Sequence, residues 1–252
     1  EDLHERRYAK IADMIYKRRE TVKIVFIAGP SSSGKTSTSK RLAIQCRILG
    51  LNPKVIELDN YFVNREDTPR DENGEYDFEA LGAMDLAFLG EQLNDLLAGK
   101  EVEIPKFDFK EGRKYFEGNF MQLREKDILI MEGIHALNPR LTEQVAESSK
   151  YRIFINTITS ISLDDHNCIP TSDNRLLRRI VRDFNKGAFT ARESIMHWPN
   201  VRRSEVQWIY PYQENADVLF NSAYLVEFAV LRAHAERILM TVPKNCPEYG
   251  EA

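Results

Sequence analysis

Residues 29–36 read "GPSSSGKT" and directly follow the apolar run "VKIVFIA". The segment matches the pattern G-x-x-x-x-G-K-[ST] in full. Gly29 and Gly34 let the backbone curl so that its N–H groups face phosphate oxygens. A helix predicted to follow adds its positive N-terminal end. The alternative is a chance match in a turn rich in serine and glycine, but a strand before the loop and a helix after it favour a nucleotide-phosphate site.

The side chains of this loop have separate expected tasks. Lys35 would reach the β- and γ-phosphates, and the Thr36 hydroxyl would ligate Mg²⁺. We therefore expect ATP and Mg²⁺ as cofactors, with the preference for ATP over GTP left open. The residues expected to bind the nucleotide here are Gly29, Ser31, Ser32, Ser33, Gly34, Lys35, Thr36 and Ser37.

Two acidic residues follow apolar strands. Glu132 ends "DILIME", and Asp59 follows "PKVIEL". Parallel strands carry their ligand sites at the carboxyl edge of the sheet, where the phosphate loop also lies. We expect Glu132 to hold Mg²⁺ or its water, and Asp59 to orient an acceptor hydroxyl and take its proton. The alternatives are an incidental acid in a turn at Glu132 and an ordinary Asp-Asn turn at Asp59.

A basic helix is predicted further along the chain, in "SDNRLLRRIVRDF". Its arginines recur at i, i+3, i+4 and i+7, so they share one face, and Ser172 or Asp173 is placed to cap the helix. They are Arg175, Arg178, Arg179 and Arg182. Such a face suits a lid, from about residue 173 to 209, that closes over transferring phosphates. The alternative is a solvated or salt-bridged surface.

Strands and helices alternate along most of the chain. Buried strands are predicted at "TVKIVFIAG", "PKVIEL", "DILIMEG", "YRIFINT" and "ADVLFN", with helices between them and short strands within residues 101–123. This order predicts a three-layer α/β/α fold with a mostly parallel sheet and a helical lid. We expect residues 1–20 to form a lead-in helix, with Leu3, Ile11 and Ile15 on its apolar side, that continues an absent N-terminal region. Residues 21–252 would form the catalytic domain.

Composition excludes several classes of protein. The 252 residues carry a net charge of −4, which argues against a nucleic-acid or membrane-surface partner. No apolar run approaches the roughly 20 residues that span a bilayer, and no signal-peptide pattern is present. The three cysteines lie far apart without C-x-x-C spacing, and the five histidines show no metal-site spacing. These features predict a cytoplasmic protein, with a homo-oligomer left open.

The motifs together resemble the phosphoribulokinase/uridine kinase family of P-loop kinases. The likeness extends from about residue 22 to 240 and rests on "GPSSSGKT", "LDNYF", "YDFEALGAMD", "IPKFDF", "MEGIHAL", "DNRLLRRIVRD" and "ENADVLFNSA". Within the family, the sequence is most similar to uridine kinase-like proteins whose N-terminal region resembles part of threonyl-tRNA synthetase. The resemblance implies a kinase whose partner is a small molecule with an acceptor hydroxyl.

The resemblance also implies roles for individual residues. Asp59 resembles the catalytic base, aided by Lys35 and Arg178, while Thr36 and Glu132 resemble the Mg²⁺ partners. Arg175, Arg178 and Arg182 resemble lid arginines that contact phosphates and substrate. The remaining residues expected to contact substrate are Tyr61 beside Asp59, Glu79 at the ribose, and Phe107 and Asp108 beside the nucleoside.

The sequence departs from uridine kinases at the expected acceptor site. Phe107 stands where uridine kinases have Tyr, and Lys110, Glu111 and Gly112 stand where a His is expected. A site that lacks a hydrogen-bonding partner discriminates poorly for that group. The resemblance therefore leads us to expect an acceptor that is a nucleoside such as uridine or cytidine, or another ribose-like or polyol metabolite. A regulatory nucleotide-binding or RNA-associated module is the remaining alternative, although "NKGA" lacks the Asp of a GTPase guanine motif.

Overall fold

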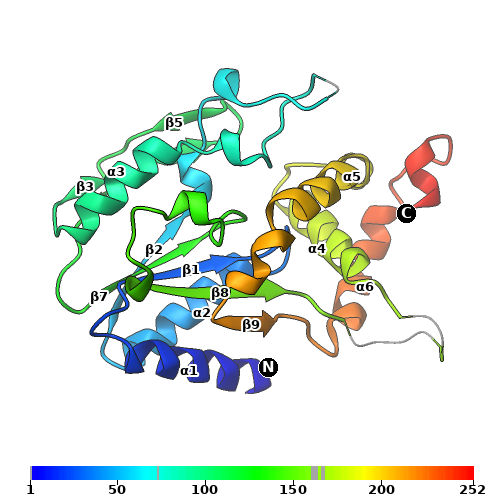
Figure 1. The fold of residues 1–252 in the computed structure, drawn as a ribbon. Coiled ribbons are helices and arrows are strands. Elements are labelled where there is room, and N and C mark those ends of the chain that lie inside the picture. The colour runs from blue at the N-terminus through cyan, green and yellow to red at the C-terminus, as the bar shows by residue number, and fades with distance from the viewer. Residues whose placement is uncertain (1, 73, 160–163, 166–167) are drawn as a thin grey trace.

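A five-stranded parallel sheet forms the centre of the protein in the computed structural model, which describes residues 2–72, 74–159, 164–165 and 168–252. The strand order is β2-β7-β1-β8-β9, and all neighbours run parallel (Figure 1). The strands are β1 (Ile24–Ala28), β2 (Asn52–Glu57), β7 (Asp127–Glu132), β8 (Lys150–Asn156) and β9 (Val218–Asn221). Every residue of β1 and β7 is buried, which explains their continuous apolar runs.

Helices α1 (Asp2–Lys17) and α2 (Lys35–Ile48) cover one face of the sheet, below it in Figure 1. Ile11 and Ile15 of α1 are buried in the core that α2 and the sheet share, as the sequence predicts. Leu3 is 60% exposed, so its expected place on the apolar side is wrong. Because α1 packs on this core, it is continuous with the fold. The proposed boundary at residue 20 stays a prediction.

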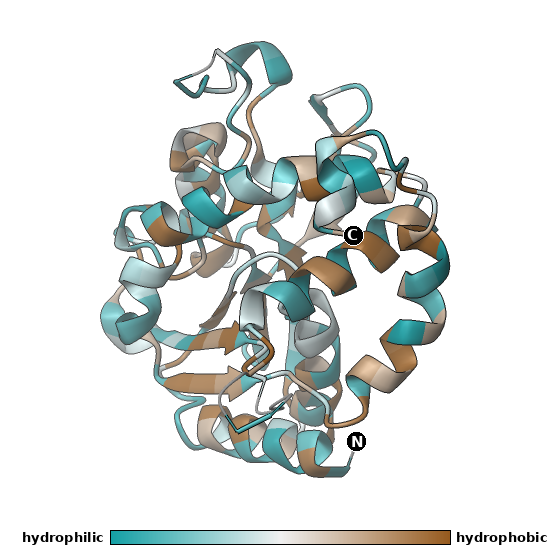
Figure 2. Ribbon diagram, turned by 90° about the vertical axis from the view of Figure 1, so that its right-hand side faces the viewer, coloured by the Kyte–Doolittle hydropathy of each residue, from teal (hydrophilic) through white to brown (hydrophobic). Residues whose placement is uncertain are grey.

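Helix α3 (Leu86–Leu97) covers the opposite face. Leu89, Leu93 and Leu96 lie one turn apart and are buried against the sheet, and the Asp85 side chain caps the helix by accepting from the Phe88 amide. Beside α3, β3 (Val102–Glu103) pairs with β6 (Phe120–Met121), and β4 (Lys106–Asp108) pairs with β5 (Arg113–Tyr115). The predicted three-layer α/β/α fold is confirmed, and Figure 2 shows the strands as its apolar layer.

The arginine-rich segment forms two helices, α4 (Thr171–Asn185) and α5 (Ala191–Trp208). They pack with α6 (Glu227–Leu239) around a small core that contains Ile180, Ile195 and Ile238. The predicted cap of α4 is wrong, because the helix begins one residue before Ser172 and no side chain caps it. The role of this segment as a lid stays a prediction.

None of the helices in the described part of the chain is both long enough and apolar enough to cross a membrane. Of the five histidines, His166 lies outside the described residues.

Candidate functional site at the carboxyl edge of the sheet

The phosphate loop connects β1 to α2 and has the backbone that the motif requires. Gly34 (φ 91°) and Ser32 (φ 59°) adopt left-handed conformations. At Gly29 the loop approaches β8 so closely that an added Cβ would lie 2.1 Å from the Ile155 carbonyl oxygen. Only glycine fits there, so the loop can curl at the N-terminus of α2 and form an anion-binding turn.

Lys35 lies at the first position of α2, and its ammonium group turns back onto the loop. Lys35 Nζ donates to the carbonyl oxygens of Gly29 (3.0 Å) and Pro30 (3.3 Å). Burial lowers the pKa of Lys35, and the nearby carboxylates of Glu132, Asp59 and Glu79 oppose that change. The structure thus brings three acids from separate segments around one lysine.

The Thr36 hydroxyl donates to the Glu132 carboxylate, which joins the start of α2 to the end of β7. Glu132 is buried, and burial raises its pKa against the opposing effects of Lys35 and Thr36. Hydroxyl and carboxylate oxygens are ligands that Mg²⁺ prefers. The two side chains that the sequence assigns to the metal are therefore adjacent and chemically suited to it.

Asp59 lies in a short 3₁₀ turn after β2, Leu58–Tyr61. Its side chain is exposed, so solvent and small molecules can reach it. The surrounding protein nevertheless raises its pKa by desolvation, and Lys35 is the largest opposing influence. An accessible carboxylate next to the phosphate loop can accept a proton from a bound hydroxyl.

Glu79 approaches the same cluster from the loop that precedes α3. Burial raises its pKa, while Arg179 and Lys35 lower it. Behind it lies His135, which is 1% exposed and which the sequence analysis did not select. Its ring nitrogens form no hydrogen bond of ordinary geometry with a described residue, although the backbones of Glu79 and Ala80 are close enough to raise its pKa slightly. Burial dominates and lowers the pKa of His135 to about 4.

The predicted substrate contact of Tyr61 is wrong. Its side chain is fully buried in the core, where Tyr61 Oη donates to Gln92 Oε1 at 2.8 Å. The turn after β2 points Asp59 outward and Tyr61 inward, so an aromatic residue beside the acid packs under α3 instead.

Strand β4, which pairs antiparallel with β5, carries Phe107 and Asp108 beside the Asp59 turn. The Phe107 amide donates to Asn60 Oδ1 at 3.4 Å, and its ring packs on Phe62. Asp108 Oδ1 accepts from the amides of Lys110 (2.8 Å) and Glu111, and these bonds lower its pKa. This oxygen holds the turn between the strands, so contact of Asp108 with a nucleoside stays a prediction.

Arg175 and Arg178 are held by protein partners in this structure, and their contact with phosphates or substrate stays a prediction. Arg175 is fully buried and paired with Glu205 of α5. Arg178 pairs with Glu227 at the start of α6. The four arginines share the helix register that the sequence predicts, but these two point into protein contacts because carboxylates from α5 and α6 meet them.

Arg179 and Arg182 are the arginines of α4 whose charges act on the acidic cluster. Arg179 lowers the pKa of Glu79, and Arg182 lowers that of Asp59. Arg179 Nη1 also donates to Ser31 Oγ at 3.1 Å in the phosphate loop. Arg182 is 42% exposed and contacts Asp183. The sequence placed Arg179 on the lid face by its i+4 spacing from Arg175, but it did not single out Arg179 as a contact of phosphate or substrate.

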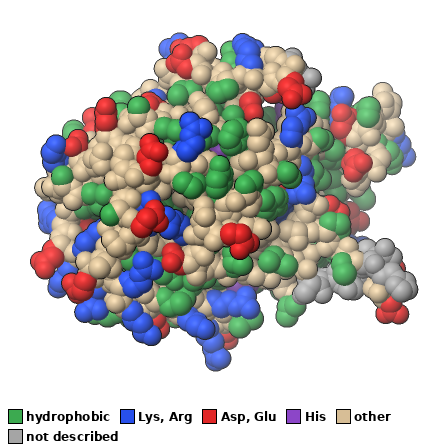
Figure 3. Space-filling view, in the orientation of Figure 1, with side chains coloured by type: hydrophobic (Ala, Val, Ile, Leu, Met, Phe, Trp, Pro, Cys, Tyr) green, Lys and Arg blue, Asp and Glu red, His purple; other side chains and the backbone are tan. Residues whose placement is uncertain are grey.

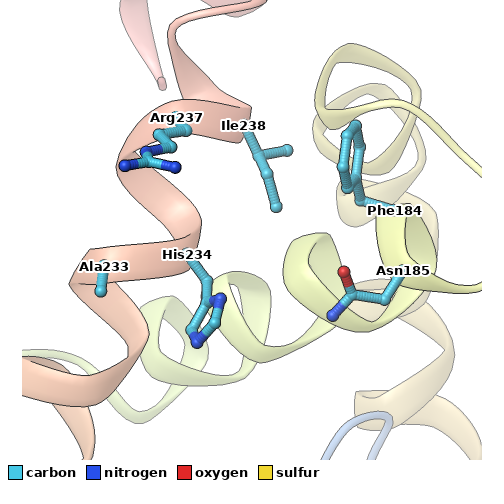
Figure 4. A pocket seen from close by; sticks show the side chains of 6 residues that line it. All are labelled: Phe184, Asn185, Ala233, His234, Arg237 and Ile238. Atoms are coloured by element: carbon cyan, nitrogen blue, oxygen red, sulfur yellow. The ribbon is translucent and has the colours of Figure 1, made fainter.

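A separate cavity of about 320 Å³ lies between α4 and α6 (Figure 4). Its lining residues are Phe184, Asn185, Ala233, His234, Arg237 and Ile238. No residue of the phosphate loop and none of the acids described above lines it, so the candidate site is the edge of the sheet.

Comparison with known proteins identifies similar sequences over most of the chain. The model of the family described as "Phosphoribulokinase / Uridine kinase family" matches residues 24–228. A uridine kinase of Macrococcus caseolyticus is 30% identical over 197 residues, covering 78% of this chain and 86% of that protein. A uridine kinase of Bacillus cereus is 31% identical over 198 residues, covering 78% of this chain and 84% of that protein.

Solved structures share the fold at low sequence identity. A possible uridine kinase from Bacillus stearothermophilus is 19% identical with a TM-score of 0.53, covering 88% of this chain and all (100%) of that one. A putative fructose transport system kinase from Silicibacter is 16% identical with a TM-score of 0.58, covering 84% and 98%. These likenesses support the fold alone.

Proposed function

Because the chain belongs to the phosphoribulokinase/uridine kinase family, and is therefore a phosphotransferase with a hydroxyl acceptor, we propose that it transfers the γ-phosphoryl group of ATP to a nucleoside resembling uridine or cytidine. Relatives named uridine kinase, about 30% identical over 78% of the chain, support the nucleoside. The observation that carries the proposal is the position of Asp59, an accessible acid beside Lys35 at the carboxyl edge of the sheet.

In this proposal, Asp59 accepts the proton of the acceptor hydroxyl as its oxygen attacks the γ-phosphorus. The bond from that phosphorus to the bridging oxygen breaks, and ADP leaves with the electron pair. Lys35 and the positive end of α2 stabilise charge on the phosphoryl oxygens. Thr36 and Glu132 would hold Mg²⁺, which neutralises phosphate charge when bound. Arg182, and Arg179 beside Ser31, add positive charge from α4.

The test of this role compares two acids at the end of β2. Asp59→Asn should retain ATP binding and lose transfer by about 10²–10⁴-fold, the usual contribution of a general base. Glu57→Gln removes another exposed carboxylate two residues earlier and should leave transfer nearly unchanged. Coupled assay of ADP release and calorimetry with ATP measure the two properties. Full transfer by the Asp59 variant would eliminate the proposed base.

The identity of the acceptor needs a separate experiment. Glu79 is the residue proposed to hold a ribose. The turn after β4 follows Phe107 and Asp108, the residues expected beside the nucleoside, and Arg65 fixes this turn by donating to the carbonyl oxygens of Phe109 (3.0 Å) and Lys110 (3.1 Å). A panel of nucleosides, sugars, phosphorylated sugars and polyols should give the highest kcat/KM with a pyrimidine nucleoside. A higher value with another ribose-like or polyol compound would keep the kinase and replace its acceptor.

An RNA-associated role receives less support from the surface. On the face shown in Figure 3, acidic side chains lie among the basic ones, so no continuous basic surface covers it. Nucleic-acid binding normally relies on such a surface and weakens steeply with salt. Salt-sensitive RNA binding together with no transfer to any acceptor would favour that role over the kinase.

A further inference from the structure

Three consecutive carbonyl groups of the phosphate loop accept hydrogen bonds from outside the loop. Arg175 Nη1 donates to the Ser31 oxygen at 3.1 Å, and Arg178 Nη1 donates to the Ser32 oxygen at 3.3 Å. Ser222 Oγ, just after β9, donates to the Ser33 oxygen at 2.5 Å. We call Arg175, Arg178 and Ser222 the carbonyl clamp.

Peptide geometry links these bonds to the phosphate-binding side of the loop. In a trans peptide the C=O and N–H groups point in opposite directions. Fixing the carbonyl groups of Ser31 and Ser33 outward therefore turns the amides of Ser32 and Gly34 the other way. The Ser33 amide is already used, because it donates to the Pro30 oxygen at 3.2 Å. The bond to the Ser32 carbonyl thus steadies that turn.

The loop needs such support because Ser32 has a left-handed backbone, with φ 59°. A left-handed residue other than glycine persists only when its surroundings over-determine it. Ser32 is the one non-glycine residue with a positive φ in the described part of the chain. Its carbonyl and those on both sides are the ones that the carbonyl clamp holds.

The two arginines of the clamp are themselves fixed. Both terminal nitrogens of Arg175 contact Glu205, and Nη2 also reaches Tyr210 Oη at 3.3 Å. Arg178 contacts Glu227 through Nε and Nη2. A direct contact of Arg175 with phosphate would require breaking a buried ion pair, which costs several kcal/mol. Arg178 Nη1 lies outside the pair with Glu227, but it already donates to the Ser32 carbonyl oxygen and to Thr157 Oγ1 at 3.0 Å.

We propose that Arg175, Arg178 and Ser222 are positioning residues that hold the phosphate loop in its anion-binding conformation through its carbonyl groups. The inference rests on the proposed function in that the ligand is a nucleoside triphosphate. It extends that function by connecting α4 and the end of β9 to phosphate affinity without any contact between these residues and the nucleotide.

Ser222→Ala tests this mechanism most directly, because the serine is uncharged and its removal leaves both ion pairs in place. Calorimetry with Mg²⁺ present should show ATP and ADP binding weakened about fivefold or more, with adenosine binding unchanged. Ser222 Oγ also accepts from Arg178 Nη1 at 3.5 Å and contacts Thr157 Oγ1 at 3.1 Å, so the variant loses more than the bond to Ser33. Arg178→Lys keeps the positive charge but loses the planar guanidinium group with its several donors. It should weaken the binding of ATP and ADP and leave the binding of adenosine unchanged. The KM for the acceptor should stay constant in both variants.

Thr241→Val is the matched control, since Thr241 Oγ1 donates to a carbonyl oxygen, that of Ile238, at 2.6 Å within its own turn after α6. It should leave ATP affinity unchanged. Unchanged ATP affinity in Ser222→Ala would overturn the carbonyl clamp, and so would an equal loss of affinity for adenosine. If the wild type still binds ATP, either result leaves the proposed kinase function standing. Absence of ATP binding by the wild type would overturn both.

Discussion

Replacing His135 by leucine should make the stability of the protein less sensitive to acid. His135 is 1% exposed, and burial lowers its pKa from 6.5 to about 4. Below pH 6.5 the histidine therefore binds a proton in the unfolded chain but stays unprotonated in the folded protein. The contribution of the neutral histidine is complete above pH 6.5 and is lost as the pH falls toward 4.

The size of this effect follows from the pKa difference. Each pKa unit corresponds to about 1.4 kcal/mol, so the full difference between 6.5 and about 4 amounts to about 3 kcal/mol. Between pH 7.5 and pH 5.0 the wild type should lose about 2 kcal/mol through this residue alone. Leucine has a similar apolar volume and cannot titrate. The variant should keep that part of its stability.

Urea unfolding of both proteins at pH 7.5 and pH 5.0 measures the difference. Lys35, Asp59, Glu79 and Glu132 titrate in both proteins, so the comparison isolates residue 135. Tyr61→Phe is the control, because it loses a buried hydrogen bond to Gln92 and should cost about 1 kcal/mol equally at both values of pH. Equal pH dependence of the wild type and His135→Leu would refute the reasoning.

Three further predictions concern the phosphate loop and its acids. Glu132→Gln should raise the Mg²⁺ concentration for half-maximal rate, because Glu132 and Thr36 supply adjacent oxygens; an unchanged requirement would contradict the metal assignment. Gly29→Ala should destabilise the protein by about 2 kcal/mol or more, since the new Cβ would lie 2.1 Å from the Ile155 oxygen; wild-type stability in urea would contradict this clash. Because desolvation by the surrounding protein raises the pKa of Asp59 and a base acts deprotonated, kcat/KM should fall with decreasing pH before the usual aspartate range near 4 is reached; a flat profile to pH 4.5 would contradict its role.

Local sequence patterns predicted the elements of this fold because each pattern reflects a local requirement. Apolar runs such as "VKIVFIA" indicate strands buried on both faces, and β1 and β7 are buried at every residue. Glycine at 50 and 99 follows α2 and α3 with φ of 84° and 76°, which ends those helices as expected. The phosphate loop could be predicted equally well, because its glycines are required by the backbone conformation at Gly34 and by the close approach of the chain at Gly29.

The sequence also indicated which acids gather near the loop. Asp59 and Glu132 follow strands of one parallel sheet, and the carboxyl ends of such strands share an edge. It could not indicate His135, because nothing local shows that the segment after β7 packs behind Glu79. Contacts between distant segments depend on the order β2-β7-β1-β8-β9, which a single sequence does not specify.

The arginine-rich helix α4 shows most clearly what the sequence alone determines and what depends on the tertiary structure. Spacing alone determined that Arg175, Arg178, Arg179 and Arg182 share a face of α4, because helix periodicity is a property of the chain itself. Only the tertiary structure decided what each one meets. Glu205 and Glu227, from α5 and α6, hold Arg175 and Arg178 against the loop carbonyl groups, and leave Arg179 and Arg182 nearer the acids. A charge on a helix takes its role from the partner that packing brings to it, and that partner lies far away in sequence.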